Sequence, residues 1–325
     1  MKILHVVYDF TPGDFRGGIA KVVYELAFEQ AQQGHEVTVF TPVVRQVPST
    51  GLPTTNINVQ TLQTLKLNNT SQAIYELTRQ HDVVHSHNTF HRLNSYVAAA
   101  GRRSGTPAFF HVHGALDPVV VNTGIMKAIK KHIYIRLIER RNLNAAQGVF
   151  ALTKAEEEQI RKWHVVSAVH VVPNGIKPPK SPSSADLEEF NARYLGLAGA
   201  RVILYLGRIN PKKGLELLIE AFGNVASKFP EAVLVLAGDR GAMPDYVHQL
   251  DTQIEKAGLQ KRVIWTGFLN EFEKCKAFAM AEVFSHVTVS EGMAVAVLEA
   301  MAAGVPTIVS PGCYMEILTL VLQLL

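Results

Sequence analysis

The sequence predicts an α/β protein of two domains, each built on a parallel sheet with helices on both faces. Strand-like apolar runs alternate with helical periodicities along the chain, and one segment rich in proline and serine interrupts this alternation. The length of 325 residues suits two domains of ordinary size. With 47% hydrophobic and 18% charged residues, the chain has enough apolar material for two cores, which excludes a disordered protein.

The first half opens with an apolar strand at 2–7, followed by a helix at 19–32. Ile19, Val22 and Leu26 lie on one face of that helix, and Gly34 provides its stop. The alternation continues through strands at 36–40, 82–86, 108–112, 148–152 and 169–172 and helices at 71–80, 92–103, 126–142 and 156–163. Such repetition predicts a parallel sheet in the domain formed by residues 1–172.

A linker separates the two halves at 173–184, where four prolines and three serines occur within twelve residues. The alternation restarts in the domain at 185–325, with strands at 202–206, 232–237, 262–266, 283–287 and 305–309 and helices at 214–227, 244–257, 270–280 and 295–303. Ligands of open α/β sheets bind at the carboxyl ends of the strands, so we expect the site in a cleft between the two halves.

Charge and cysteine content narrow the class of protein. The 32 Lys and Arg exceed the 28 Asp and Glu, and the net charge of +4 suits an anionic ligand or a membrane face but gives no argument for nucleic acid. Cys275 and Cys313 are too few for a disulfide framework, which favours a reducing cytosol. Residues 1–10 indicate a strand rather than a signal peptide, and no run of about 20 uncharged apolar residues predicts a membrane span.

The strongest motif is a pair of glutamates. Glu291 lies on the loop that precedes the helix at 295–303, and Glu299 lies inside that helix. A helix N-terminus offers free backbone N–H groups and positive potential, which suits a diphosphate, and carboxylates accept hydrogen bonds from sugar hydroxyls. The loop that would supply the N–H groups comprises Gly292, Met293, Ala294 and Val295. The alternative is a buried helix with two incidental acids.

A second motif lies where a strand of the second half ends and a helix begins. Arg208 can form a bidentate contact with phosphate oxygens, Lys213 adds a compact charge, and Gly214 permits a close start of the helix. A weaker signal is the pair Gly17 and Gly18 before the first helix, which would let the backbone approach a ligand. A solvated basic turn and a plain glycine turn are the respective alternatives. Neither motif has the GxGxxG spacing that a NAD dehydrogenase needs.

Histidines cluster at the ends of two predicted strands, as His85 and His87 and as His111 and His113. Alternate residues of a strand share one face. With His91, the first pair superficially resembles a metallohydrolase HxH motif, but no Asp follows His87 and neither cysteine is near in sequence, so we expect no metal ion. The sequence leaves open whether these histidines line the site or are structural.

Taken together and in this order, the motifs resemble family 4 of the glycosyltransferases with the GT-B fold. The resemblance extends from residue 1 to about residue 310, and it also includes the Pro-Asn-Gly-Ile segment at 173–176 and the Gly-Val-Pro segment at 304–306. It implies two Rossmann-like domains that face a cleft. It also implies retaining transfer of a hexose from a nucleotide-diphosphate sugar, such as a UDP- or GDP-sugar, with no cofactor and no metal.

The resemblance implies roles for individual residues. Arg208 and Lys213 would bind the donor diphosphate, and Glu299 would bind the ribose. Glu291 would bind the transferred sugar. The other implied contacts are the amides of 292–295 with phosphate and sugar, Gly18 beside Gly17 with the donor phosphate, and His113 at the reaction centre. No carboxylate is placed as a covalent nucleophile, so we expect front-face attack by the acceptor, assisted by the leaving phosphate.

The chain departs from the family pattern in two places. The family usually has Gly-Phe-Gly where this chain has Gly292, Met293 and Ala294, and the Cβ of Ala294 disfavours a positive φ. After about residue 310 the family continues through further strands and helices, whereas this chain ends in an apolar segment at 317–325. The sequence therefore predicts a truncated second domain. A non-catalytic remnant and a GT-B sugar-nucleotide epimerase are the alternative functions.

The acceptor is expected on the first domain. Basic residues of the predicted helix at 126–142 lie opposite apolar residues that recur every four positions, a pattern that permits contact with anionic lipid. The basic residues are Lys127, Lys130, Lys131, Arg136, Arg140 and Arg141, and the apolar ones are Ile129, Ile133 and Leu137. A solvated basic helix is the alternative. By analogy with the family, we expect a polysaccharide, lipid-linked or small-molecule acceptor and a bacterial cytoplasmic protein at the inner face of the membrane.

Overall fold

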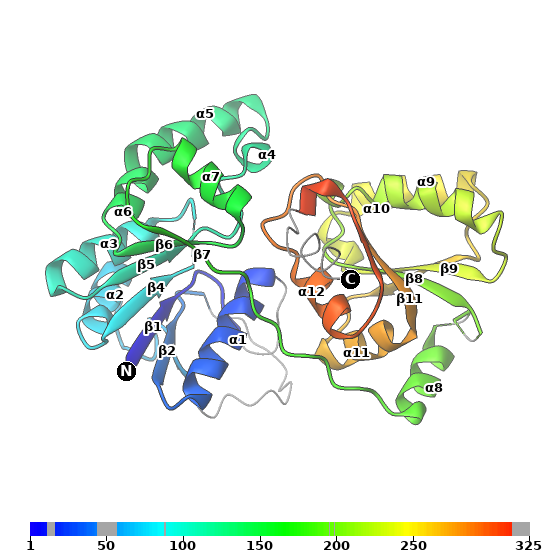
Figure 1. Ribbon diagram of the computed structural model, residues 1–325, viewed down its shortest axis with the longest axis horizontal. Helices are drawn as coiled ribbons and strands as arrows, with labels where there is room; N and C mark the ends of the chain where they lie inside the picture. Colours follow the sequence, from blue (N-terminus) through cyan, green and yellow to red (C-terminus); the bar gives the residue numbers. More distant parts are fainter. Residues whose placement is uncertain (12–16, 44–56, 88, 195, 198, 314–325) are drawn as a thin grey trace. The chain divides into compact units, whose positions relative to one another are not determined.

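The computed structural model describes residues 1–11, 17–43, 57–87, 89–194, 196–197 and 199–313 (Figure 1). Within these residues the chain forms two compact units, 1–175 and 176–313. The predicted apolar end at 317–325 lies outside the described residues. Each unit has its own parallel sheet and its own hydrophobic core.

The sheet of the first unit has seven parallel strands in the order β3-β2-β1-β4-β5-β6-β7. The strands are β1 (Lys2–Val6), β2 (Glu36–Phe40), β3 (Ile57–Gln60), β4 (Val83–Ser86), β5 (Ala108–His111), β6 (Gly148–Ala151) and β7 (Val169–Val171). The predicted parallel sheet is therefore confirmed. The sequence did not predict β3, because four residues reading Ile-Asn-Val-Gln give too short an apolar pattern.

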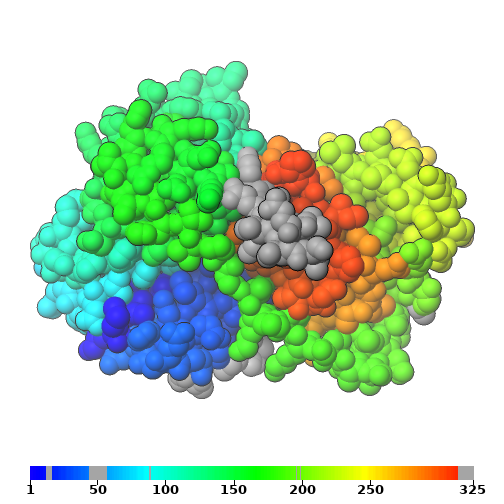
Figure 2. Space-filling view, in the orientation of Figure 1, coloured from blue at the N-terminus to red at the C-terminus, as the bar shows by residue number. Residues whose placement is uncertain are grey.

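Helices cover both faces of this sheet, as the alternation of apolar residues along β1 requires. Leu4 and Val6 belong to one core cluster, while Ile3 and Val7 belong to another that includes Tyr24 of α1. The helices are α1 (Gly18–Gln32), α2 (Thr70–Thr78), α3 (Arg92–Ser104), α4 (Pro118–Val121), α5 (Ile125–Tyr134), α6 (Arg140–Asn144) and α7 (Lys154–Lys162). In the space-filling view, the blue segment that includes α1 forms the lower part of the visible surface of this unit (Figure 2).

The predicted helix at 126–142 is not one regular α-helix. A π-helical turn, η1 (Ile135–Glu139), joins α5 directly to α6. This turn carries the buried side chain of Glu139, which accepts a hydrogen bond from Nδ2 of Asn94. Burial raises the pKa of Glu139 to about 7, and the hydrogen bonds from Asn94 and Asn142 oppose that rise. The extra residue of a π turn is not visible in apolar periodicity, so the sequence could not predict it.

The second unit has a five-stranded parallel sheet in the order β10-β9-β8-β11-β12. Its strands are β8 (Arg201–Leu206), β9 (Ala232–Ala237), β10 (Val263–Gly267), β11 (Ala281–His286) and β12 (Thr307–Val309). Its helices are α8 (Ser184–Arg193), α9 (Leu215–Ala226), α10 (Pro244–Lys256), α11 (Glu271–Met280) and α12 (Val295–Ala302), with 3-10 turns η2 (Pro211–Lys213), η3 (Arg240–Ala242) and η4 (Pro311–Cys313). The sequence did not predict α8, although a capping box of Ser183 and Asp186 marks its start.

Close packing at the end of β9 yields a first prediction. A Cβ at Gly238 would overlap the carbonyl oxygen of Gly207 and lie 2.7 Å from Cδ1 of Ile209. Gly238→Ala should therefore lower the free energy of unfolding by about 2 kcal/mol or more, measured by urea denaturation. The matched control is Gly223→Ala inside α9, where the nearest atom lies at 3.8 Å. This control should stabilise the protein by up to about 1 kcal/mol, and equal effects of the two variants would contradict the prediction.

Candidate functional site

The candidate site of the second unit is built around a buried ion pair. Lys213 is the last residue of η2, and Glu291 lies on the loop between β11 and α12. Lys213 Nζ donates a hydrogen bond to Glu291 Oε2, and the two side chains are 8% and 24% exposed. Burial acts to raise the pKa of Glu291, but the charge of Lys213 outweighs it and holds this pKa below its usual value. The structure thus brings two of the sequence-predicted residues together.

Backbone hydrogen bonds hold the loop that carries Glu291. The carbonyl of Lys212 accepts from Val289 N at 3.0 Å and from Thr288 Oγ1 at 3.1 Å. The amide of Glu291 donates to the carbonyl of Gly312 at 2.8 Å. These bonds tie the loop after β11 to η2 after β8, so the ion pair is fixed by backbone on both sides.

His286 is a third member of this group that sequence reasoning missed. It ends β11, its side chain is buried, and its Nε2 lies 3.4 Å from Lys213 Nζ. Its ring stacks on Tyr205 with centroids 5.7 Å apart. Burial and then the charge of Lys213 lower the pKa of His286 to about 4, so the neutral ring accepts a hydrogen bond from Lys213. Its place at the end of a predicted strand was the signal that could have identified it.

Glu299 has a different lysine partner. It is buried within α12, and its Oε1 lies 3.5 Å from Nζ of Lys274 on α11. Lys274 Nζ also donates to Oε1 of Glu271 at 2.6 Å. The two glutamates of the sequence motif therefore belong to two lysine–carboxylate groups, and Lys274 is a second residue that the sequence did not predict.

The loop before α12 adopts ordinary backbone geometry. Ala294 is the N-cap residue with φ −71° and ψ 107°, so its Cβ causes no strain, and Gly292 and Met293 precede it on the same loop. Within the described residues no side chain caps α12, which leaves N–H groups of its first turn, from Val295 onward, available to an acceptor. Arg208 is exposed, and its carbonyl accepts from the hydroxyl of Tyr205 at 2.9 Å.

The glycine pair of the first unit lies at the start of α1. Gly17 is the N-cap residue with extended φ of −149°, and both Gly17 and Gly18 are exposed. No described atom lies within 4 Å of a Cβ placed on Gly17, so packing does not require glycine there. In the described part of the chain, α1 has no side-chain cap, and its first turn holds no acid. This helix N-terminus is therefore suited to an anion.

Five histidines from β1, β4, β5 and the residues just after β4 and β5 form what we call the histidine column: His5, His85, His87, His111 and His113. Hydrogen bonds of 3.0–3.1 Å join the ring nitrogens of three pairs within it, His5–His87, His87–His113 and His85–His111. Burial lowers the pKa of every ring, to about 4 for His5 and His113, to about 3 for His85 and well below the usual value for the other two. The column is therefore neutral at pH 7.

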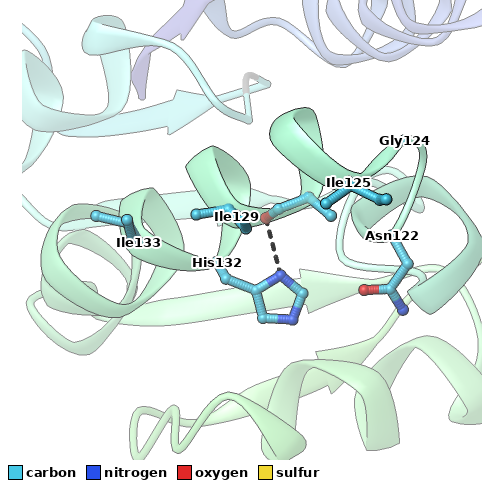
Figure 3. Close-up of a pocket in the computed structure, with 7 residues that line it drawn as sticks. Asn122, Gly124, Ile125, Ile129, His132 and Ile133 are labelled. Atoms are coloured by element: carbon cyan, nitrogen blue, oxygen red, sulfur yellow. Dashed lines mark hydrogen bonds between the residues drawn. The ribbon is translucent and has the colours of Figure 1, made fainter.

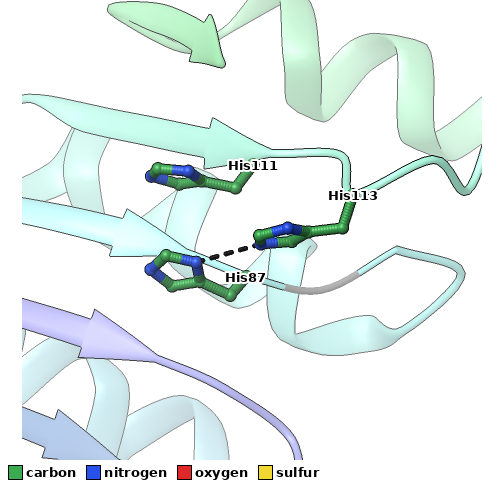
Figure 4. A group of neighbouring side chains, drawn as sticks. All are labelled: His87, His111 and His113. Carbon is green, nitrogen blue, oxygen red and sulfur yellow. Dashed lines mark hydrogen bonds between the residues drawn. The ribbon is translucent and has the colours of Figure 1, made fainter. Parts of the chain in front are cut away.

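The geometry of the column favours stacking over metal binding. One nitrogen from each of His87, His111 and His113 lies within 4.8 Å of the others (Figure 4). However, the three rings are nearly parallel, with interplanar angles of 16° to 27°. Nδ1 of His87 and Nε2 of His113 are hydrogen-bonded to each other at 3.1 Å, and the ring of His111 stacks on that of His87 with centroids 4.1 Å apart, so the rings are already engaged with one another. His91 lies apart from the column, where its Nδ1 caps α3 by accepting from Leu93 N at 3.2 Å.

His113 also has unusual backbone geometry. Its φ is +54°, a conformation that costs free energy for residues other than glycine, and Gly114 follows with φ +74°. The buried carboxylate of Glu156 accepts the amide hydrogens of Gly114 and, at 2.6 Å, of Leu152. Burial raises the pKa of Glu156, and these two backbone hydrogen bonds oppose the rise. Glu156 thus holds the strained turn that presents His113.

Comparisons with known proteins agree with this architecture. Residues 188–318 match the family model described as glycosyl transferases group 1, and residues 17–175 match the glycosyl transferase 4-like domain. An uncharacterized glycosyltransferase of Methanocaldococcus jannaschii is 36% identical over 154 residues, which cover 46% of this chain and 38% of the relative. The chain therefore spans well under half the length of that relative.

Two longer matches cover nearly the whole chain. The GDP-mannose:cellobiosyl-diphosphopolyprenol alpha-mannosyltransferase of Xanthomonas campestris is 26% identical over 319 residues, which cover 95% of this chain and 78% of that protein. A crystal structure of Anabaena HepE in complex with UDP and glucose has a TM-score of 0.76 and 22% identity, and it covers 97% of this chain and 82% of that one. At this identity the structural match shows the fold alone.

Two parallel α/β units of this kind form the GT-B fold, and the family models that match them are those of glycosyltransferases. The two family models lie in succession along the chain, one on each unit. The chain belongs to family 4 of the glycosyltransferases, enzymes that take their sugar from nucleotide-sugar donors, and the resemblance found in its motifs is confirmed.

The neutral histidine column predicts acid sensitivity of the first unit. Because the folded pKa values lie below the unfolded value of about 6.5, the unfolded chain binds more protons, and stability present above pH 6.5 is lost as the pH falls toward about 4. Glu139 and Glu156 have raised folded pKa values and act in the opposite direction, but they are outnumbered by five rings.

We therefore expect the urea midpoint to fall between pH 7.5 and pH 5. The chain has two tryptophans, Trp163 in the first unit and Trp265 in the second, so fluorescence of a Trp265→Phe variant reports on the first unit alone. The complementary Trp163→Phe variant is the control, because the second unit has no such column and should show a smaller shift. A midpoint of the first unit that does not change with pH would contradict the prediction.

Proposed function

We propose that the protein transfers a hexose from a nucleoside diphosphate sugar to a saccharide or lipid-linked acceptor with retention of anomeric configuration. The observation that carries this proposal is the buried pair of Lys213 and Glu291 beside the uncapped start of α12. A cation, free N–H groups and a carboxylate are the groups that a diphosphate and a sugar require.

The leaving group determines the chemistry of the first step. As the bond from the anomeric carbon to the diphosphate breaks, negative charge develops on the phosphate and positive charge on the sugar. Lys213, Arg208 and the amides of 292–295 would stabilise the phosphate, and Glu291 would hold the sugar hydroxyls. The acceptor oxygen forms the new bond on the same face, and its proton passes to the departing phosphate oxygen. Trapping of a covalent sugar adduct on the protein would contradict this front-face mechanism.

The remaining groups have binding roles in this proposal. Glu299, held by Lys274, would accept hydrogen bonds from the ribose hydroxyls. Gly17 and Gly18, at the uncapped start of α1, would approach the donor phosphate. His113 would line the reaction centre as a neutral ring. No cofactor and no metal ion enter this scheme.

Removal of the lysine charge tests the donor site. Lys213→Ala should lower kcat/KM with a UDP- or GDP-sugar by about 100-fold or more, because one preorganised charge at the leaving group is lost. Since that variant also leaves Glu291 without its partner, the double variant Lys213→Gln with Glu291→Gln should show the same loss without an unpaired buried charge. Lys228→Ala, at an exposed lysine of the same unit, is the control. Wild-type rates in the double variant would contradict the assignment.

We also propose that α5 and η1 contact a membrane surface. The apolar residues of this segment face outward, with Ile125 82%, Ile129 50%, Ile133 53% and Leu137 54% exposed. The segment also carries four of the six basic residues noted above, and the other two, Arg140 and Arg141, begin α6. Its apolar and basic side chains together suit anionic lipid. No helix in the described ranges is both long and apolar enough to cross a bilayer. The name of the Xanthomonas relative includes a lipid-linked acceptor, which supports the proposed membrane contact.

A shallow groove runs beside the same apolar residues. It has a volume of about 580 Å³ and is lined by Asn122, Gly124, Ile125, Ala128, Ile129, His132 and Ile133 (Figure 3). Four of these residues are isoleucine or alanine, and Nδ1 of His132 donates to the carbonyl of Ala128 at 2.9 Å. The groove therefore offers an apolar surface to the acyl or prenyl part of a lipid.

Vesicle flotation tests the membrane contact. The protein should bind vesicles that contain phosphatidylglycerol more tightly than pure phosphatidylcholine, and binding should weaken with salt. The double variant Ile129→Asp with Ile133→Asp should reduce binding at least tenfold, because two apolar contacts become charged. Val166→Asp is the matched control, since Val166 is equally apolar and 79% exposed in the same unit. Equal binding of the two variants would argue against α5 as the contact.

A further inference from the structure

A continuous chain of hydrogen bonds leads from α1 to His113. Gln30 Oε1 lies 2.7 Å from His5 Nε2, His5 Nδ1 lies 3.0 Å from His87 Nε2, and His87 Nδ1 lies 3.1 Å from His113 Nε2. His5 and His87 are buried, whereas Gln30 and His113 are partly exposed. The chain therefore connects a side chain near the surface to the half-buried ring in the strained turn after β5.

The end of this chain at Gln30 fixes the position of every proton along it. A carbonyl oxygen can only accept, so His5 Nε2 must carry a hydrogen. A neutral imidazole has one N–H, so His5 Nδ1 accepts from His87 Nε2, and His87 Nδ1 in turn accepts from His113 Nε2. His113 is thus left with a lone pair on Nδ1. The low pKa values of the three rings exclude a second proton on any of them at pH 7.

We propose that Gln30, His5 and His87 are positioning residues that hold His113 in the Nε2–H tautomer, so that its Nδ1 accepts a hydrogen bond from a sugar hydroxyl. The inference rests on the proposed function for its substrate, but the tautomer itself does not. It assigns His113 the role of a neutral acceptor, because its only N–H is used within the column.

Three features favour this role over a purely structural one. A buried structural histidine needs partners for both nitrogens, whereas the described residues provide one for Nε2 of His113 and none for Nδ1. Of the three rings in the chain, His5 and His87 are buried and His113 is the partly exposed one, so its ring is the one nearest to solvent. The buried Glu156 maintains the strained turn with φ +54° at His113. Backbone strain that the surrounding structure maintains is typical of functional positions, which favours a functional role for this ring.

The position of Gln30 provides a test three hydrogen bonds away from His113. Gln30→Lys replaces an acceptor by a donor, which should reverse every proton along the chain and leave His113 with Nδ1–H. Gln30→Glu keeps an acceptor and should keep the direction. Gln32→Lys adds the same charge at an exposed position of the same helix and is the matched control. None of these variants alters the column itself or a residue of the donor site.

The first readout is the tautomer, measured by long-range ¹H–¹⁵N correlation on protein labelled with ¹⁵N-histidine. The His113 signals are assigned by their loss in His113→Asn. We expect Nε2–H at His113 in the wild type, Gln30→Glu and Gln32→Lys, and Nδ1–H in Gln30→Lys. Nδ1–H in the wild type, or no change in Gln30→Lys, would overturn the proposal even if the protein proved inactive with every sugar nucleotide.

The second readout is transfer from the preferred nucleotide sugar. Gln30→Lys should lower kcat/KM about tenfold, the effect of one neutral hydrogen bond, while Gln30→Glu should restore most of the rate and Gln32→Lys should equal the wild type. A reversed tautomer with unchanged kcat/KM would refute the role at the substrate. Absence of transfer by the wild type would instead refute the proposed function, and the tautomer result would still stand.

Discussion

All strands of a parallel sheet end at the same edge. Polar side chains at the strand ends therefore lie close together, and those that are buried must form hydrogen bonds or ion pairs with one another. In the second unit, Lys213 and Glu291 meet between the ends of β8 and β11. In the first unit, the histidine column and Glu156 occupy the corresponding edge. A buried polar group without a partner costs about 1–3 kcal/mol, so each member depends on its neighbours and the groups act as units.

The sequence predicted the parts of this arrangement that depend on local patterns. The order of strands and helices follows from apolar periodicity, and the motif glutamates and Lys213 stand out because turn chemistry surrounds them. Two elements were not predicted, because one is very short and the other begins inside a proline-rich segment. The strand β3 has four residues, while α8 begins with a capping box at Ser183 inside a segment whose prolines indicated a linker.

Local sequence patterns could not predict the contacts that define the sites, because these contacts join distant parts of the chain. His286 and Lys213 are 73 residues apart, and His5 and His87 are 82 apart. Only the order of the strands, with β1 beside β4 and β8 beside β11, makes them neighbours. The same holds for Lys274 and Glu299, whose two helices lie on opposite sides of β11 in the sequence.

The two units bury polar groups with different charge, and this difference matches the proposed division of roles. In the second unit the paired Lys213 lowers the pKa of Glu291 and so keeps this carboxylate ionised, and the lysine is the cation that a diphosphate needs. The column of the first unit holds five rings whose desolvation removes their charge. Neutral nitrogens bind hydroxyl groups without attracting phosphate. The electrostatics therefore favours an anionic ligand beside the lysine–glutamate pair of the second unit and a neutral, hydroxyl-rich one beside the histidine column of the first.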